Sequence, residues 1–355
     1  MGFLRLWLAL AVLSGHFAPT VLGYKMLEAG PAVLGFFVLS GFYMAMVLDT
    51  KYRWDLPAFY WNRLLRLWPS YLLVLAASLA AYLAALALFG VPLGPFVPLV
   101  KAHGRLDHAT LAATLLAQAS MLGPGFSHLF EVTRTGGLAW SPNSYMQANS
   151  LWRLDLLPQT WSLSTEIVFY ALAPWIVRWR SRTLALAFLG GLAVRLALGL
   201  MPPPYAWCAR LIPLDLTVFC AGVLLWRQQR DKAPALGPRG RAGLAGLAVA
   251  YLACASYASG IVFQALWAPL AAAALIPWLM EPGRGGPWER TLGELSYPLF
   301  LCHLLVGRLI VLGGFDGPWL TVVGAAVSLA IAYLIHRLLE RPLERRFKRV
   351  PRPAR

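Results

Sequence analysis

Ten long apolar runs limit the fold of this sequence more than any other feature. A run of about 20 apolar residues has the length that a helix needs to cross the hydrocarbon core of a bilayer. Of the 355 residues only 13% are charged, about half of the share in a typical soluble domain. The sequence therefore predicts an all-α, polytopic membrane protein with about ten transmembrane helices. The predicted spans cover residues 3–22, 31–48, 68–89, 161–178, 183–200, 211–226, 242–259, 262–280, 291–313 and 317–339.

The positive charges between these runs predict the orientation of the chain. With the N-terminus in the cytoplasm, 23 of the Lys and Arg residues fall in cytoplasmic segments and six in external segments. Cytoplasmic loops of membrane proteins are enriched in Lys and Arg, so both termini are predicted to be cytoplasmic. The net charge of +16 is then a topology signal that faces anionic lipid, not a nucleic-acid surface. We expect a multi-pass protein of the plasma (inner) membrane.

Two apolar segments allow a second interpretation. Residues 110–121 are apolar but short, and a span there would reverse the side of every later loop. An interfacial or re-entrant helix is therefore favoured for them. The first run also has features of a signal peptide, with an apolar core at residues 6–13. The spacing of two ionisable residues in this run favours a retained helix.

Arg5 and His16 are these two residues, eleven positions apart. On an α-helix this spacing places both side chains on one face, about 20° apart in direction and about 16 Å apart along the axis. Ionisable residues inside a span are rare and usually functional. With Arg5 at the cytoplasmic edge, His16 lies past the midplane of the membrane, towards the outside.

Five further motifs follow in order along the apolar runs. They are LGFFVLSGF at 34–42, RLLRLWPSY at 63–71, WSLSTEIVFY at 161–170, LGELSYPLFLCH at 292–303 and ERP at 340–342. Together with Arg5 and His16 they make the chain resemble the acyltransferase-3 family of integral membrane O-acyltransferases over essentially its whole length. Members of that family transfer acyl groups, usually acetyl from acetyl-CoA, to hydroxyls of sugars, polysaccharides, peptidoglycan or macrolides. The resemblance implies an acyltransferase-3-like transmembrane domain at 1–340 and a short basic cytoplasmic tail at 341–355.

His16 is the predicted general base of such a transfer. A group that titrates near neutral pH has to take the proton of the acceptor hydroxyl, and His is the usual choice. The phosphates of the donor, acetyl-CoA or another acyl-CoA, need a positive clamp. Arg63 and Arg66 are three residues apart, hence on one helix face at the cytoplasmic edge, and Arg5 joins this clamp or orients the path to His16. The alternative is that Arg63 and Arg66 only mark the cytoplasmic end of a helix.

Four charged residues lie within later spans, and we expect them to converge on one polar cavity in the outer half of the membrane. They are Glu166, Arg195, Asp215 and Arg308. Because a charge at the centre of a span costs about 2.5–3.5 kcal/mol, two acids and two arginines should pair. Glu166 lies in a matched motif and is expected to act in catalysis. For the other three, a purely structural ion pair between helices is an equal alternative to binding the substrate.

His303 is a second candidate histidine. It follows Pro298 by five residues, and a proline inside a helix frees a backbone carbonyl and kinks the helix. The resemblance places a histidine of the family at this position. Acceptor binding, proton relay and packing are three open roles for it.

The remaining histidines and cysteines are assigned to solvent or to packing. We expect His103, His108 and His128 to be solvated and His336 to lie at the membrane interface. The four cysteines show no metal-ligand spacing, so no metal and no tightly bound cofactor are predicted.

The segment at 123–159 is long for a loop, which usually indicates a function or disorder. It is a candidate lid or acceptor-binding segment, and its Trp140, Tyr145 and Trp152 suit either sugar rings or a membrane interface. The predicted partners are thus the lipid bilayer, acyl-CoA and a carbohydrate or glycolipid acceptor. A non-enzymatic transporter or flippase for a glycan or lipid is the alternative, as is acylation of a small molecule such as a macrolide.

Overall fold

The computed structural model describes most of the chain. It covers residues 1–17, 20–21, 24–95, 97, 106–141, 144–199, 210–231, 237, 239–240, 242–243, 246, 271, 275–276 and 286–351. Long helices dominate these ranges, and the only strands in them form two short hairpins.

Eight of the predicted spans coincide with helices. These are α1 (Gly2–Phe17), α2 (Ala29–Val47), α3 (Leu56–Phe89), α6 (Trp161–Ile176), α7 (Ser181–Gly199), α8 (Ile212–Asp231), α11 (Pro287–Leu312) and α12 (Leu320–Ile335). The predicted spans at 242–259 and 262–280 fall largely outside the described residues. Five stretches are long and apolar enough to cross a bilayer: Ala29–Tyr52, Leu56–Phe89, Ser181–Leu198, Pro287–Leu312 and Leu320–Phe347. The all-α membrane class is therefore confirmed.

Two of the helices continue beyond their regular part. A π-helical turn, Leu48–Tyr52, extends α2, and a second one, His336–Glu340, joins α12 to α13 (Arg341–Phe347). Such turns are rare and often occur at functional sites. In this protein both lie near the cavity described below.

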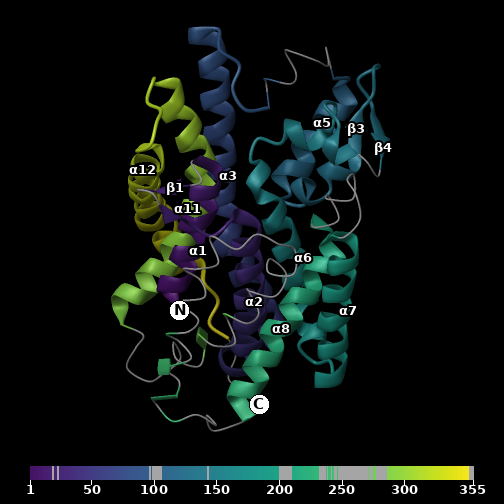
Figure 1. The fold of residues 1–355 in the computed structure, drawn as a ribbon, viewed down its shortest axis with the longest axis vertical. Coiled ribbons are helices and arrows are strands. Elements are labelled where there is room, and N and C mark those ends of the chain that lie inside the picture. The colour runs from purple at the N-terminus through teal and green to yellow at the C-terminus, as the bar shows by residue number, and fades with distance from the viewer. Residues whose placement is uncertain are drawn as a thin grey trace.

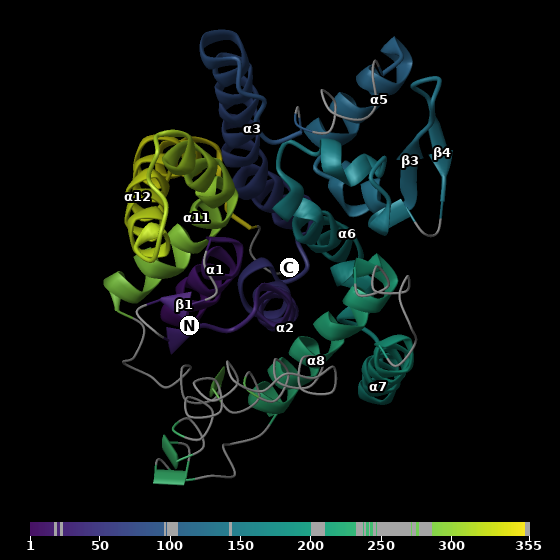
Figure 2. The same ribbon diagram turned by 45° about the horizontal axis from the view of Figure 1, so that its top comes forward.

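α1 lies at the centre of the described bundle, between α2 on one side and α11 with α12 on the other (Figures 1 and 2). α8 packs on α2, and α7 packs on the outside of α8. Close approach of α2 and α8 depends on small residues, as is common between membrane helices. A Cβ on Gly41 would lie 2.1 Å from the Phe219 carbonyl oxygen, and one on Gly222 would lie 2.0 Å from that of Val38.

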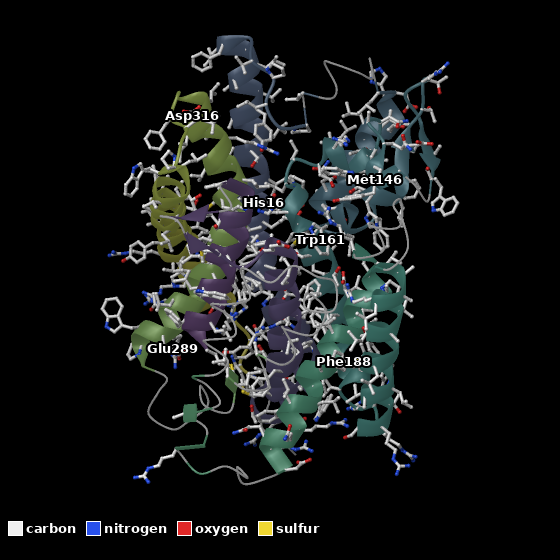
Figure 3. The ribbon with its side chains drawn as sticks, viewed as in Figure 1. His16, Met146, Trp161, Phe188, Glu289 and Asp316 are labelled. Atoms are coloured by element: carbon white, nitrogen blue, oxygen red, sulfur yellow. The ribbon has the colours of Figure 1, made fainter. Side chains whose placement is uncertain are left out.

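Several contacts define one end of the bundle. The Met1 amino group and Glu289 form an ion pair, which places the start of α11 beside the start of α1. Trp61 near the start of α3 donates from Nε1 to the Phe347 carbonyl oxygen, at 2.8 Å. We call this the N-terminal end. It is the lower end in Figure 3, where Glu289 is labelled, and Asp316 marks the opposite end.

Residues 106–160 form a compact unit at the opposite end. The unit contains α5 (His108–Ala119), the hairpin of β3 (Phe130–Val132) and β4 (Leu138–Trp140), and several 3-10 turns; the other hairpin joins β1 (Thr20–Val21) and β2 (Tyr24–Lys25). At 12 residues, α5 is too short to span a bilayer. Its end is fixed to α3, because the Tyr71 hydroxyl donates to the Gln118 carbonyl oxygen at 2.7 Å.

The expectation that His128 is solvated is wrong. His128 is 3% exposed, and its neighbours in this unit, Ser127 and Asp155, are equally buried. The Ser127 hydroxyl donates to an Asp155 carboxylate oxygen at 2.6 Å. The reason is that this segment has its own small core around Val132 rather than being an open loop. His108 is exposed, as expected, and His103 lies outside the described residues.

Candidate active site

A cationic cavity of about 480 Å³ opens at the N-terminal end of the bundle. Six basic side chains line it: Arg5, Lys51, Arg63, Arg66, Arg290 and Lys348. Glu294 and Glu344 are its acidic lining residues, so positive charge is in excess. A cavity of this size and charge suits a ligand with several phosphates.

The arginines of the cavity are brought together by α1 and α3. Asp55 caps α3, accepting from the Ala58 amide at 3.3 Å, and this fixes the start of the helix about two turns before Arg63 and about three turns before Arg66. Arg5 comes from α1, with its guanidinium carbon 5.4 Å from the centre of the Tyr43 ring. The Nε atoms of Arg5 and Arg63 are buried and make no hydrogen bond within the described residues. Buried donors of this kind gain from a ligand that accepts from them.

Glu166 lies next to this cavity, not in the expected outer cavity with the arginines. Its Oε1 atom accepts from the Ser40 hydroxyl at 2.7 Å and from the Tyr170 hydroxyl, and both of those residues line the cavity. The reason is the rotation of α6 about its axis, which turns Glu166 towards Ser40 of α2. Residues 166 and 170 are four apart and so share the face towards α2.

His16 and His303 meet at the other end of α1. The distance between His303 Nε2 and His16 Nδ1 is 3.2 Å, and the ring centres are 5.1 Å apart. His16 Nδ1 is also 2.9 Å from the Val12 carbonyl oxygen, and His303 Nδ1 is 2.7 Å from that of Phe300. His303 is fully buried, whereas His16 is exposed. One exposed imidazole is thus in contact with a second, buried one.

These hydrogen-bond partners assign the tautomers of both rings. A carbonyl oxygen accepts only, so Nδ1 of His303 carries a proton and its Nε2 has a lone pair. That lone pair and the Val12 carbonyl oxygen both face Nδ1 of His16, which therefore donates. The Nε2 atom of His16 is left unprotonated, as a general base requires.

Phe17 fixes the position of His16. Its ring lies between α11 and α12, where a Cβ on Gly307 or Gly324 would come within 2.4 Å and 2.2 Å of it. Only glycine leaves room for the ring at these two positions. The end of α1, and with it the adjacent His16, is thereby held against α11, which carries His303.

The other predicted charges do not form one shared cavity. Arg195 of α7 forms an ion pair with Asp215 of α8, and both side chains are almost completely buried, at 10% and 0% exposed. Arg308 of α11 donates instead to the hydroxyl of Tyr82 on α3. The helix pairs α7–α8 and α3–α11 are packed separately, so these charges are distributed over different contacts.

One match to a known protein family identifies the family of this chain. Residues 1–337 match the profile of a family described as an acyltransferase domain, Acyl_transf_3. The chain belongs to the acyltransferase-3 family. With its apolar helices, the acyltransferase-3 chain is a multi-pass membrane acyltransferase. No curated protein and no solved structure gives a significant match to it.

His336 of the acyltransferase-3 chain is buried among its neighbours, at 5% exposed. It lies between two carboxylates, 3.2 Å from Glu294 and 2.9 Å from Glu340. Glu340 belongs to the ERP motif and also accepts from the Ser70 hydroxyl at 2.8 Å. The π-helical turn that contains His336 thus ties α12 to α3 and α11, directly beside the cavity.

Some residues of the acyltransferase-3 site were not predicted from the sequence. Lys51, Arg290 and Lys348 were counted only as charges of cytoplasmic loops, yet all three line the cavity. Arg210 was counted as an external charge, and its guanidinium group contacts the faces of two aromatic rings, those of Tyr145 and Trp161. Their position at the ends of helices was the available signal. No cluster of three or more potential metal ligands occurs in the part of the chain that the structure describes.

Proposed function

We propose that this protein transfers an acyl group, most simply acetyl, from acyl-CoA to a hydroxyl of a sugar, a cell-surface polysaccharide or a related acceptor. One observation carries the proposal. The single helix α1 contributes Arg5 to the cationic cavity and His16 to the histidine pair, about 16 Å apart along its axis. A donor and an acceptor that enter from opposite faces of the membrane would meet along this helix.

The cationic cavity is the proposed site of the donor. Arg63 and Arg66 bind phosphates of acyl-CoA, since guanidinium groups form paired, charge-assisted hydrogen bonds with phosphate oxygens. Lys51 and Arg290 add further positive charge. The excess of positive charge in the loops of this end supports its location on the cytoplasmic side of the plasma membrane. Acyl-CoA is available on that side. The acyl-bearing arm then extends along α1, past Glu166 and Tyr170, towards His16.

The histidine pair is the proposed site of the chemistry. Nε2 of His16 takes the proton of the acceptor hydroxyl while the hydroxyl oxygen attacks the thioester carbonyl carbon. The tetrahedral intermediate collapses, the carbon–sulfur bond breaks, and the leaving thiolate is neutralised by the proton that His16 took up. The products are the O-acyl ester and free CoA thiol. His303 accepts from Nδ1 of His16 and keeps the ring oriented throughout, so it is a positioning residue.

The donor side is tested with purified protein in lipid nanodiscs. The measurements are CoA-thiol release and transfer of radiolabelled acetyl to a panel of carbohydrate acceptors. Replacing both Arg63 and Arg66 with Gln should raise KM for acetyl-CoA at least about tenfold, the effect of losing about 1.4 kcal/mol of phosphate binding. Replacing the exposed Arg182 with Gln is the matched control and should change nothing.

Two results would contradict the proposal. An unchanged KM in the double variant would remove the donor from this cavity. Transmembrane movement of a glycan or lipid without any thiol release would identify a transporter or flippase instead.

A further inference from the structure

Arg210 is held by the faces of two aromatic rings. Its guanidinium carbon lies 4.8 Å from the centre of the Tyr145 ring and 5.0 Å from that of Trp161. Trp152 stacks on Tyr145 with ring centres 5.4 Å apart, and its Nε1 atom donates to the Tyr145 carbonyl oxygen. Contacts of this type between a cation and aromatic faces stabilise the cation.

This arrangement leaves the edge of the guanidinium group unused. A guanidinium carries five N–H donors, all of them in its plane, and a contact with the face of an aromatic ring leaves them available to a hydrogen-bond acceptor. Within the described part of the chain, Arg210 makes no hydrogen bond and no ion pair, and its side chain is only half-buried. The rings of Tyr145 and Trp152 contact one another, and Tyr145 also contacts Arg210.

Arg308 supplies a second positive charge on the same side. It donates to the Tyr82 hydroxyl, a neutral partner, and lies 5.4 Å from the centre of the Tyr82 ring. The charges of both Arg210 and Arg308 act on His16. The acid whose charge acts on Arg210 is Asp215, and Asp215 is already paired with Arg195. Within the described residues, the proposed base is thus affected by two positive charges that form no ion pair.

An anion is the ligand that this geometry favours. Planar, fixed guanidinium edges bind carboxylate and phosphate groups through two parallel hydrogen bonds. Such bonds are stronger in a partly desolvated site than in water. A neutral acceptor would leave both arginines unmatched, whereas an acceptor with one negative group would be drawn to them and oriented there. Figure 3 shows His16 and Trp161 at a similar height in the bundle, which is where Arg210 and the base have to meet one acceptor.

We propose that the acceptor is an anionic carbohydrate, whose carboxylate or phosphate binds Arg210 with help from Arg308 while its hydroxyl faces His16. This inference rests on the proposed function and adds the class of acceptor to it. The shared chemistry is one negative group on the sugar. A uronic-acid carboxylate and a sugar phosphate are its two sources, and they are separated by the choice of probe.

The test measures binding of three probes to the purified full-length protein in nanodiscs, by calorimetry. The probes are methyl glucoside, methyl glucuronide and glucose 1-phosphate. At least one anionic probe should bind about tenfold or more tightly than the neutral one, and added salt should weaken the preference. The better of the two anionic probes identifies the source of the negative group.

Variants test whether the preference for anionic probes depends on Arg210. The change Arg210→Gln should abolish the preference, and Arg210→Lys should keep part of it, because lysine retains the charge but not the planar edge. The exposed Arg134 of the 106–160 unit provides the matched control, and Arg134→Gln should keep the full preference. CoA binding by each variant shows that it is folded.

The outcomes separate this inference from the proposed function. Equal binding of all three probes by the wild type, or an undiminished preference in Arg210→Gln, would overturn the anionic acceptor even if the protein transfers acetyl groups. A preference that depends on Arg210, without any CoA-thiol release, would support the anion site and contradict the acyl transfer.

Discussion

Nε2 of His303 lies 3.2 Å from Nδ1 of His16, and His303 is fully buried while His16 is open. The carbonyl oxygen of Phe300 fixes the tautomer of His303, and His303 in turn fixes the tautomer of His16. In the proposed mechanism, two neutral imidazoles in series would do what a carboxylate and an imidazole do in many hydrolases, since they would leave one nitrogen as the base. The buried ring adds no charge to the membrane interior, where a charge would be costly.

Replacing His303 with Phe should therefore lower kcat about 10–100-fold, the usual effect of losing a residue that orients a reactive imidazole. KM for acetyl-CoA should stay unchanged, because His303 is remote from the cationic cavity. His303→Gln, which keeps a hydrogen-bond acceptor, should recover part of the activity. Steady-state kinetics with purified protein would show this split, and an equal loss in the Phe and Gln variants would indicate that His303 only fills space.

The packing of Phe17, which positions His16, can also be tested. Gly307→Ala and Gly324→Ala place a methyl group where the Phe17 ring now lies, so each should displace the end of α1 and reduce kcat about tenfold or more. Overpacking of this kind also costs about 1–3 kcal/mol of stability. Gly190→Ala in α7, which meets nothing within 4 Å, is the control. Activity and thermal unfolding are measured on all three variants, and a fully active Gly307→Ala variant would refute the role given to Phe17.

The ion pair of Arg195 and Asp215 is predicted to be structural. Asp215→Ala leaves Arg195 with a buried charge and should destabilise the protein by about 3–5 kcal/mol. Replacing both residues with Leu removes both charges and should restore most of the stability. Chemical unfolding reports the stability, and acetyl transfer by the double variant reports the function. If the double variant is stable but inactive, the pair belongs to the active site after all.

Two buried groups in the 106–160 unit should make its stability depend on pH in opposite directions. Burial raises the pKa of the Asp155 carboxyl from 3.8 to about 7. Its contribution to stability is complete below the unfolded pKa and is lost as the pH rises through about 7. Burial, reinforced by the charge of Arg210, lowers the pKa of His128 from 6.5 to about 4. That contribution is complete above pH 6.5 and is lost as the pH falls to about 4.

Between about pH 4 and pH 6.5 the contribution of Asp155 to stability falls with rising pH while that of His128 grows. The stability of the wild-type unit should therefore change little in this range. In Asp155→Asn only the pH dependence caused by His128 remains, so the unit should become less stable towards pH 4. In His128→Gln only the pH dependence caused by Asp155 remains, so the unit should become less stable towards pH 7. Hydrogen exchange of this unit, corrected for intrinsic rates, measures both. The same pH dependence in both variants would contradict the assignment.

The sequence was sufficient for the parts of this account that depend on local chemistry. Apolar length predicted eight helices where the structure has them, because a span is defined by its own residues. Helical spacing correctly placed Arg63 and Arg66 on one face of α3 and in one cavity.

Contacts between distant helices were beyond such reasoning. Glu166 was expected to face arginines, and its partners are the hydroxyls of Ser40 and Tyr170, since the rotation of α6 about its axis is set by packing. The burial of His128 and His336 depends on neighbours more than 25 residues away or on a π-helical turn. The pairing of His16 with His303 joins segments 287 residues apart, and spacing within one helix contains no information about it.

The role of His16 as the base is the central claim, and one comparison tests it most directly. Wild-type protein and the His16→Gln variant are purified into nanodiscs, and each preparation is measured for CoA binding and for transfer of radiolabelled acetyl from acetyl-CoA. The account predicts unchanged CoA binding and a loss of transfer of about 10²–10⁴-fold, the usual contribution of a general base. Transfer at the wild-type rate by a His16→Gln variant that binds CoA normally would contradict it.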